Sequence, residues 1–370
     1  MKITCDAKEL STIVTALATV APSKSPRPVL CDVYIHATTD GAVLSATDLE
    51  VRANRKLVAC DVEASGEACI PAARAKAVMK NVPEGKVTLE ATPTGARLVY
   101  GKNSVALLAA SQPRDWPTDV LGQPGVVIAT VPAKALLDGI RWSAIPGLQH
   151  AERLYSHKTL FAFGPGGLTL YGAASSLASK ALVSHDVYAK GEYLLTHQAL
   201  NAVTTLLSED GDVVIATAEN AIRFTQGPVS VTTLQADGAA KFPPIDNVIP
   251  KFEDFAAVDR QEFLTAAKQA ALVLSKESVG IDLSLKKNGL LIGGADTAIG
   301  TAALEVEAAW DGEEHEARLA QDFIAATLAA AASEAVGVVI STFREPVVVL
   351  DGEDRIMLIM GIEKAPKEVA

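Results

Sequence analysis

The feature that most constrains the fold of this chain is a pattern that occurs three times. Each occurrence is a short predicted strand, then an amphipathic helix, then strands joined by tight turns. The three stretches are Gly66–Ala110, Gly191–Ala236 and His315–Ile362. They begin about 125 residues apart, and self-similarity at a fixed period indicates a repeated structural unit. The sequence therefore predicts three equivalent domains.

Length and composition agree with a folded protein of several domains. The chain has 370 residues, more than one hydrophobic core usually serves. Apolar residues make up 49% and charged residues 21%, a balance typical of folded chains and not of disordered ones. We predict domains at 1–120, 121–250 and 251–370, the last with a short charged tail, Glu363–Ala370.

Two proline-containing stretches fall where the period predicts domain boundaries. Gln112–Gln123 and Ala240–Phe252 each carry an aromatic-Pro pair, Trp116–Pro117 and Phe242–Pro243. Such composition is typical of linkers between domains.

Each domain is predicted to hold two helices within a strand-rich sequence. In the first domain Asp6 is expected to cap a helix, and strands are expected at Val29–Ala37, Ala42–Ala46 and Val51–Val62. Later helices are predicted at Pro132–Ser143, Gln198–Leu207, Gln261–Leu274 and Gln321–Ser333. Short strands in series with Asp-Gly turns indicate antiparallel sheet, so the predicted fold class is α+β.

The cysteines and the apolar runs favour a cytoplasmic protein. The four cysteines, Cys5, Cys31, Cys60 and Cys69, fit neither a zinc site nor a disulfide framework, and we expect buried free thiols. The longest apolar runs, such as Leu328–Ala332, are too short to span a bilayer. The N-terminal residues lack the apolar stretch of a signal peptide.

No catalytic motif is recognisable in the sequence. It contains no dinucleotide-binding or P-loop glycine pattern, no HExxH and no GxSxG. Among the six histidines only His150 and His157, seven residues apart, leave a shared ligand role open. We predict no catalytic residue, no metal site and no cofactor.

The charge of the chain is unevenly distributed. Its net charge is −11, which argues against general electrostatic attraction to nucleic acid. Yet the predicted helix from Ala72 to Val82 contains no acidic residue. Its apolar face is opposite Lys76 and Lys80, with Arg74 beside them. This basic face is either simply solvated or a surface for an anionic partner.

These residues resemble the bacterial DNA polymerase III β subunit family, the sliding clamps. The resemblance covers essentially the whole chain and is strongest in the first domain. The segments that carry it are MKIT at the start, ATDLEV at 46–51, IPAA at 70–73, the Asp-Trp-Pro at 115–117, and RIMLIMGI at 355–362.

The resemblance implies a non-catalytic processivity factor that encircles double-stranded DNA. In this family two subunits of three domains form a head-to-tail homodimeric ring, with helices lining the hole. The implied partners are DNA, the polymerase III catalytic subunit, the clamp loader, and other polymerases and repair proteins that use short linear motifs. No membrane partner is implied.

The family's DNA-contacting positions map onto seven residues of this chain. By resemblance they are Lys24, Arg74, Lys76, Lys80, Gln149, Arg153 and Tyr155. The predicted second helices of domains two and three, Gln198–Leu207 and Gln321–Ser333, contain no Lys or Arg. We therefore expect DNA contact to be concentrated in the first domain.

The family also has an apolar cleft between domains two and three that receives linear motifs. The matching positions are Tyr155, Leu177, Pro243, Val248, Pro346, Val347, Met360 and Ile362. Val347, Met360 and Ile362 are equally explained as core strand residues. This chain departs from the family at Ala173–Leu177 and at Gly361, where proline is usual, so its partner motifs stay open.

Ring closure in the family pairs domain one of one subunit with domain three of the other. The matching positions are Ala106, Leu108, Val273, Leu274 and Val279. Ala106 replaces a larger apolar residue, which predicts a looser contact.

Two alternatives remain open from the sequence. One is a diverged clamp paralogue that serves repair, plasmid or phage replication. The other, more remote, is an enzyme of unknown type with a site at a domain joint.

Overall fold

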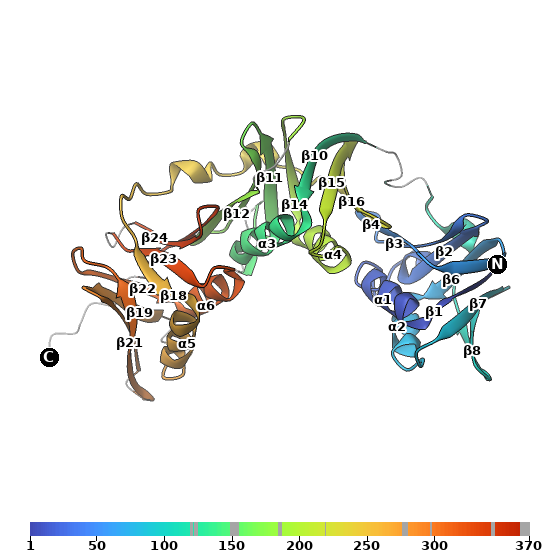
Figure 1. Ribbon diagram of the computed structural model, residues 1–370, viewed down its shortest axis with the longest axis horizontal. Coiled ribbons are helices and arrows are strands. Elements are labelled where there is room, and N and C mark those ends of the chain that lie inside the picture. The colour runs from blue at the N-terminus through green and yellow to red at the C-terminus, as the bar shows by residue number, and fades with distance from the viewer. Residues whose placement is uncertain are drawn as a thin grey trace. The chain divides into compact units, whose positions relative to one another are not determined.

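Six copies of one module follow one another along the chain, each a strand, a helix and three antiparallel strands (Figure 1). Two modules make one repeat, and the chain has three repeats. The computed structural model describes residues 1–118, 121, 125–148, 155–183, 187–218, 220–275, 280–296, 298–341 and 345–362.

The helices and strands of each repeat follow the same order. The first repeat contains β1 (Lys2–Asp6), α1 (Ala7–Leu17), β2 (Asp32–Thr38), β3 (Gly41–Thr47), β4 (Val51–Lys56), an additional β5 (Cys60–Ala64), β6 (Gly66–Pro71), α2 (Ala72–Met79), β7 (Lys86–Thr92), β8 (Gly95–Tyr100) and β9 (Asn103–Leu108). The second contains β10 (Val126–Pro132), α3 (Ala133–Ala144), β11 (Lys158–Gly164), β12 (Gly167–Ala173), β13 (Leu177–Val183), β14 (Gly191–Thr196), α4 (His197–Leu206), β15 (Asp212–Ala218), β16 (Ala221–Gln226) and β17 (Val229–Leu234). The third contains β18 (Ala256–Asp259), α5 (Arg260–Ala271), β19 (Gly280–Lys286), β20 (Gly289–Asp296), β21 (Gly300–Ala309), β22 (His315–Ala320), α6 (Gln321–Ala330), β23 (Ala335–Val339), β24 (Val347–Asp351) and β25 (Arg355–Ile359).

The chain forms two compact units, and the middle repeat contributes to both. The first unit comprises residues 1–134 and 198–235, and the second comprises 135–197 and 236–370. The predicted fold class, α+β with three similar repeats, is confirmed by this order of elements. The domain boundaries at 120 and 250 stay a prediction.

Three antiparallel sheets organise the two units. The first unit has a five-stranded sheet in the order β5-β1-β7-β8-β9 and an eight-stranded sheet, β10-β15-β16-β17-β4-β3-β2-β6. The second unit has a twelve-stranded sheet, β14-β11-β12-β13-β25-β24-β23-β18-β21-β20-β19-β22. Two of these sheets therefore continue from one repeat into the next.

The strands that join repeats share one position in the module. β4, the last strand of one module, pairs with β17, the last strand of another, and β13 pairs with β25 in the same way. Each joint is antiparallel, so backbone hydrogen bonds hold neighbouring repeats together. A joint of this kind uses the edge strand of one repeat to cover the edge strand of the next.

Local sequence signals explain the start of α1. Asp6 caps the helix, and its Oδ1 accepts from the backbone N–H groups of Lys8 and Glu9 at 2.9 and 3.0 Å. Leu10, Ile13 and Leu17 are buried at helical spacing, as their positions in the sequence predict.

The ATDLE segment is a tight turn between β3 and β4. Asp48 Oδ1 accepts from the N–H groups of Glu50 and Val51 at 2.9 and 2.7 Å. Thr47 Oγ1 donates to the Val51 carbonyl, and Leu49 has a positive φ of 83°. Side-chain acceptors of this kind stabilise a turn whose backbone a leucine rarely adopts.

Three expectations from the sequence are corrected by the structure. The strand expected from Val29 begins at Asp32, because Pro28–Cys31 forms a 3-10 turn. The strand expected over Val51–Val62 is two strands, β4 and β5, with a break after Lys56. Of the four free cysteines only Cys5 and Cys69 are buried, whereas Cys31 and Cys60 are half-buried.

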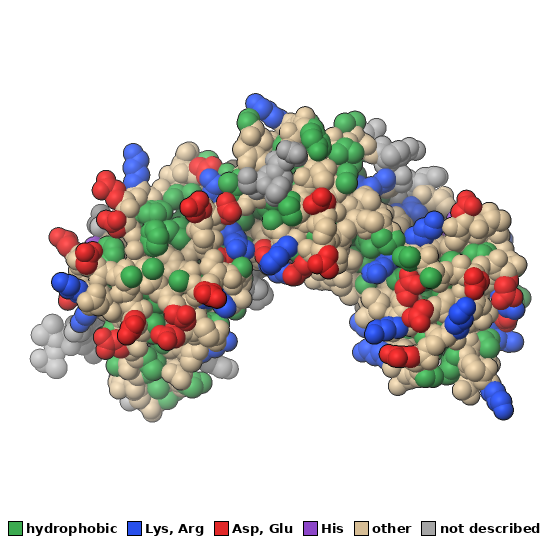
Figure 2. All heavy atoms as spheres, in the orientation of Figure 1, with side chains coloured by type: hydrophobic (Ala, Val, Ile, Leu, Met, Phe, Trp, Pro, Cys, Tyr) green, Lys and Arg blue, Asp and Glu red, His purple; other side chains and the backbone are tan. Residues whose placement is uncertain are grey.

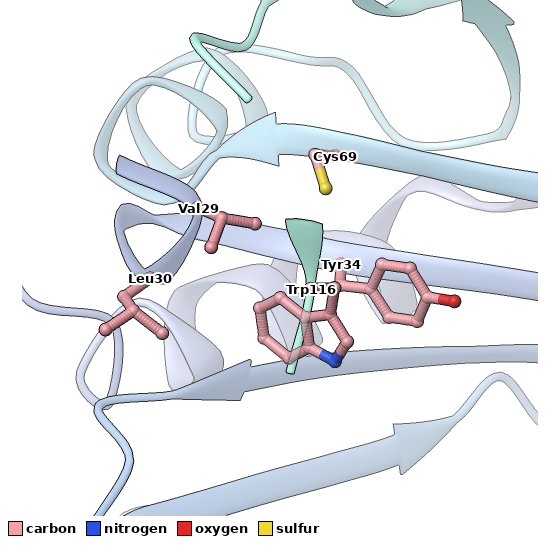
Figure 3. Close-up of a cluster of buried hydrophobic side chains, with 5 residues drawn as sticks. All are labelled: Val29, Leu30, Tyr34, Cys69 and Trp116. Atoms are coloured by element: carbon pink, nitrogen blue, oxygen red, sulfur yellow. The ribbon is translucent and has the colours of Figure 1, made fainter. Parts of the chain in front are cut away.

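The first predicted linker is anchored by a tryptophan. The indole of Trp116 is 4% exposed and stacks on the ring of Tyr34, with centroids 5.0 Å apart and planes at 6°. Val29, Leu30 and Cys69 complete this cluster (Figure 3). Beyond it, Arg52 donates to the carbonyl of Thr118 at 2.8 Å. The linker is therefore packed against the first repeat.

None of the helices within the described ranges has the length and apolarity that crossing a membrane demands.

We expect Trp116→Ala to destabilise the protein, because it removes the ring that packs the linker against Tyr34. The loss in the free energy of unfolding should be about 3 kcal/mol, as for other buried aromatic truncations. Urea unfolding followed by circular dichroism measures it. The control is Trp310→Ala, since Trp310 is only half-buried and donates to the Glu313 carbonyl. Equal losses in the two variants would contradict the anchoring role.

Candidate functional site

Helix α2 presents the basic face that the sequence predicts. Ala72, Ala75 and Met79 are buried, whereas Val78 is half-buried. Arg74 and Lys80 are exposed, and Lys76 is half-buried. Because the helix has no acidic residue, these three cations are not neutralised from within it. Figure 2 shows Lys and Arg side chains over the part of the first unit that carries α1 and α2.

A groove of about 530 Å³ adjoins this basic face, between α1 and α2. Its α1 wall carries the polar side chains of Lys8, Ser11, Thr12 and Thr15, and Thr19 follows the helix. Lys80, Glu84 and Thr205 also line the groove. Sequence reasoning missed this wall, although the i, i+4 spacing of Ser11, Thr15 and Thr19 was the available signal. The hydroxyls of Thr12 and Thr19 donate to the backbone carbonyls of Lys8 and Ala16, at 2.9 and 2.7 Å. The ammonium groups of Lys8 and Lys80 are the groove's groups best suited to phosphate oxygens.

The other predicted DNA-contacting residues are only partly placed. Lys24 is exposed in the turns that follow α1. Tyr155 is half-buried, and its ring packs edge-on against Phe242 with centroids 5.8 Å apart. Gln149 and Arg153 lie outside the described residues, as does His150.

A second groove, of about 460 Å³, lies in the second unit. Six of the eight predicted cleft residues line it, namely Tyr155, Leu177, Pro243, Val248, Pro346 and Met360. Its walls are largely apolar, and the segment from Ala173 to Ala178 forms one side. Val248 and Met360 are 55% and 41% exposed, so apolar surface is available to a ligand.

The remaining two predicted cleft residues do not line this groove. Val347 is 3% exposed, within strand β24. Ile362 is half-buried, and its N–H donates to the Arg318 carbonyl at 2.7 Å. The core-strand explanation of Val347 accounts for its position. Ile245 and Leu358 take part in the groove although the sequence did not single them out.

The second predicted linker forms one wall of this groove and is fixed at both its apolar and its polar side chains. Phe242 and Ile249 pack on a core of Ile245, Val348 and Leu358. Asp246 accepts from Tyr171 Oη and Lys180 Nζ, each at 2.7 Å. Burial alone raises the pKa of Asp246, but the hydrogen bonds from Lys180 and Tyr171 outweigh it and lower that pKa.

The titratable groups of the described residues do not form a metal centre. No group of three or more His, Cys, Asp and Glu within those ranges is placed to hold an ion. His157 and His197 pack edge-on with centroids 6.1 Å apart. Burial, then the neighbouring His157, lowers the pKa of His197 to about 4, so His197 is neutral at pH 7.

Comparisons with known proteins agree with this geometry. The sequence model of a protein family, described as the DNA polymerase III beta subunit, N-terminal domain, matches residues 1–118. The beta sliding clamp of Pseudomonas aeruginosa is 27% identical over 297 residues, 79% of each chain. That of Synechococcus elongatus is 24% identical over 323 residues, covering 83% of this chain and 84% of the relative.

Solved structures share the fold along nearly the whole chain. The polymerase III subunit beta of Pseudomonas aeruginosa superimposes with a TM-score of 0.85 at 22% identity, covering 98% of this chain and all of that one. The sliding clamp of Bacillus subtilis gives a TM-score of 0.86 at 18% identity, covering 99% of this chain and all of that one. The chain is a diverged member of the β sliding clamp family.

The family resemblance assigns five positions of this chain to the contact between subunits, and four of them lie within the described residues. Leu108 is 59% exposed and Ala106 is exposed, both on β9. Val273 and Leu274 are half-buried after α5, next to Leu272, which is 79% exposed. Val279 lies outside the described residues.

A buried carboxyl group lies beneath the basic helix. Asp32 is 3% exposed and pairs in register with Pro71, the residue that precedes α2. Its Oδ2 makes no hydrogen bond with any described residue. Burial raises the pKa of Asp32 to about 6. This carboxyl is therefore ionised at neutral pH, and its ionisation lowers the stability of the folded state.

This buried carboxyl predicts a pH dependence. Because the folded pKa lies above the unfolded one, the group favours the folded state at acidic pH, and this contribution is lost as pH rises through about 6. Between pH 5 and pH 8 the wild type should lose about 1–2 kcal/mol of unfolding free energy relative to Asp32→Asn. Urea titrations of both proteins at the two pH values measure the difference. Parallel pH profiles would contradict the assignment.

Proposed function

We propose that this chain is a DNA sliding clamp, a processivity factor that encircles duplex DNA as a homodimer in the cytoplasm. The edge strand β9 and the part of β21 that is paired on one side only among the described residues, in a fold of the β sliding clamp family, carry the proposal. Such a ring holds DNA by topology and performs no catalysis. Loading would need an ATP-driven loader supplied by other proteins.

Ring closure follows from the rule that joins the repeats. β4 pairs with β17 and β13 pairs with β25, each the last strand of its module. The two remaining last strands are β9 and β21. Among the described residues β9 pairs only with β8, and β21 meets β18 only at Ala308 and Ala309.

Pairing β9 of one copy with β21 of another would repeat the same joint between subunits. A second, identical contact then closes a dimer and covers both exposed edges. The exposed Leu108 on β9 and the apolar group Leu272–Leu274 are suited to such a contact. Ala106 offers little apolar surface there, which supports a looser closure than in relatives with a larger residue.

The basic face of α2 is the proposed DNA contact. Arg74, Lys76 and Lys80, together with the exposed Lys24 after α1, supply cations in a protein of net charge −11. Few cations are enough for a ring, because tight phosphate binding would slow its movement along DNA. Helices α4 and α6 contain no Lys or Arg, so the contact is concentrated in the first repeat.

The apolar groove of the second unit is the proposed site for the linear motifs of polymerases, the clamp loader and repair proteins. Its volume and largely apolar walls are suited to a few side-chain anchors, which supply most of the binding energy in such contacts. The wall formed by Pro243, Ile245 and Val248 is held by Asp246, so it is preformed for a ligand.

A clamp paralogue specialised for repair, plasmid or phage replication is the second candidate. The absence of Lys and Arg from α4 and α6 favours it, because a replicative ring has more reason to contact DNA from every repeat. Binding of the replicative polymerase's motif would distinguish the two.

The test of the proposed function is retention on circular DNA after loading by the host's loader. The wild type should stay on nicked circles and leave once they are linearised. Arg74→Glu, Lys76→Glu and Lys80→Glu together should leave retention on circles intact, because the ring holds DNA by topology, but should weaken equilibrium binding to linear duplex. The slope of log binding constant against log salt should become shallower by up to about 3, since each phosphate contact contributes about 0.9.

The matched control reverses three exposed lysines outside the helices, Lys190, Lys286 and Lys287, and leaves the salt slope unchanged. Retention that is equal on linear and circular DNA would contradict the proposed ring. An unchanged salt slope in the α2 variant would contradict the proposed α2 contact alone.

The groove makes a separate prediction about partner motifs. Met360→Asp should weaken binding of a labelled peptide carrying the polymerase III catalytic subunit's motif at least about tenfold, because it places a charge among apolar walls. Fluorescence anisotropy measures the change. Val126→Asp, at a side chain 73% exposed in the first unit, is the control and should bind as the wild type does. Equal affinities in all three proteins would rule out the groove as the site.

A further inference from the structure

Two of the four cysteines face each other across neighbouring strands. Cys5 on β1 is the register partner of Cys60 on the antiparallel strand β5. The next pair on the same face is Ile3 with Val62. Directly opposed residues of an antiparallel pair point to the same side, so the two thiols share one face of the sheet.

The spacing of opposed residues suits a disulfide bond. Cα atoms of opposed antiparallel residues lie about 4.5–5.5 Å apart. Disulfides are found for Cα separations of about 4.4–6.8 Å, so the usual spacing of directly opposed residues falls within the range that a disulfide requires. The other cysteines lack such a partner: Cys69 pairs in register with Tyr34, and Cys31 lies in the turn before β2.

The two thiols differ in their access to solvent. Cys5 is 2% exposed, whereas Cys60 is half-buried. Burial raises the pKa of Cys5 to about 12, and Cys60, Glu9 and Asp6 add to that rise. An oxidant therefore reaches Cys60 first, while Cys5 remains a protonated thiol beside it.

We propose that Cys5 and Cys60 form a redox modification site, at which a hydroperoxide converts the facing thiols into a reversible cross-strand disulfide. This inference is independent of the clamp function. Cytoplasmic disulfides, where they occur, are mostly transient and redox-sensing, which fits a pair of otherwise free thiols.

Oxidation of Cys5 and Cys60 to a disulfide needs hydrogen peroxide as its only co-reactant. The Cys60 thiolate attacks one peroxide oxygen, the O–O bond breaks, and the hydroxide that leaves takes up a proton to become water. The sulfenic acid on Cys60 is then attacked by Cys5 Sγ as its proton is lost. The S–S bond forms, the S–O bond breaks, and a second water leaves. Two electrons pass from the thiols to the peroxide.

The bond would fix a weakly held edge strand. Among the described residues β5 pairs only with β1, and its ion pairs, Lys2–Glu63 and Lys86–Asp61, are solvent-exposed. The preceding loop is tied to α1, because the N–H of Val58 donates to Glu9 Oε1 at 2.8 Å. A disulfide at Cys60 would therefore fix both β5 and this loop to the strand that leads into α1.

The test uses the full-length, fully reduced protein treated with hydrogen peroxide and then unfolded for thiol counting. The wild type should fall from the four thiols of its sequence to two, with a mass lower by about 2 Da. Digestion after Lys and Glu should give one cross-linked peptide pair joining Cys5 to Cys60. The melting temperature should rise by roughly 5–10 °C, because the closed loop restricts the unfolded chain, and should return after dithiothreitol.

Two variants make the result specific. Cys60→Ser should lose no pair of thiols and show no rise in melting temperature. Cys31→Ser changes the other half-buried cysteine and should still form the cross-link. The proposal is overturned if the wild type keeps all its thiols, if the cross-link joins other cysteines, or if Cys60→Ser loses a pair of thiols as the wild type does.

Discussion

Antiparallel pairing between the last strands of successive modules is the interaction on which the rest of the structure depends. Without the joints β4–β17 and β13–β25, each module would expose a row of unpaired backbone N–H and C=O groups. With them, strands of different repeats form one continuous sheet within each unit. The same rule leaves β9 as an edge strand and Gly300–Glu307 of β21 paired on one side only among the described residues, which supports the proposed ring of two chains.

The two linkers between repeats are anchored to the repeats beside them. Trp116 is fixed by stacking on Tyr34, and Asp246 by hydrogen bonds to Tyr171 and Lys180. A linker held in this way loses little further conformational entropy when a ligand binds beside it. The groove in the second unit therefore owes one of its walls to a segment that composition alone would describe as a flexible connection.

The distribution of charge is suited to the proposed ring in two ways. An acidic chain avoids general attraction to nucleic acid, while a short acid-free helix keeps cations at one place. The adjacent wall of α1 adds hydroxyl groups, and Lys8 is the charged side chain that it contributes to the groove. Weak, local contacts of this kind suit a protein that holds DNA by topology.

Much of the candidate site could be predicted because its signals are local. The cap at Asp6, the buried face of α1 and the exposed cations of α2 follow from residues within a few turns of one helix. The threefold period predicted the architecture for the same reason, since each repeat encodes its own order of elements. The family resemblance supplied the positions of the groove, which local patterns do not encode.

The sequence by itself determined the module, the number of repeats and the charged face of α2, because these depend on neighbours along the chain. Only the tertiary structure decided where strands break, as after Lys56, and which edges stay open. It alone brought Tyr155, Pro346 and Met360 to one groove and set Cys5 opposite Cys60. These outcomes depend on register between strands distant in sequence, and a shift of one residue would place every side chain on the opposite face.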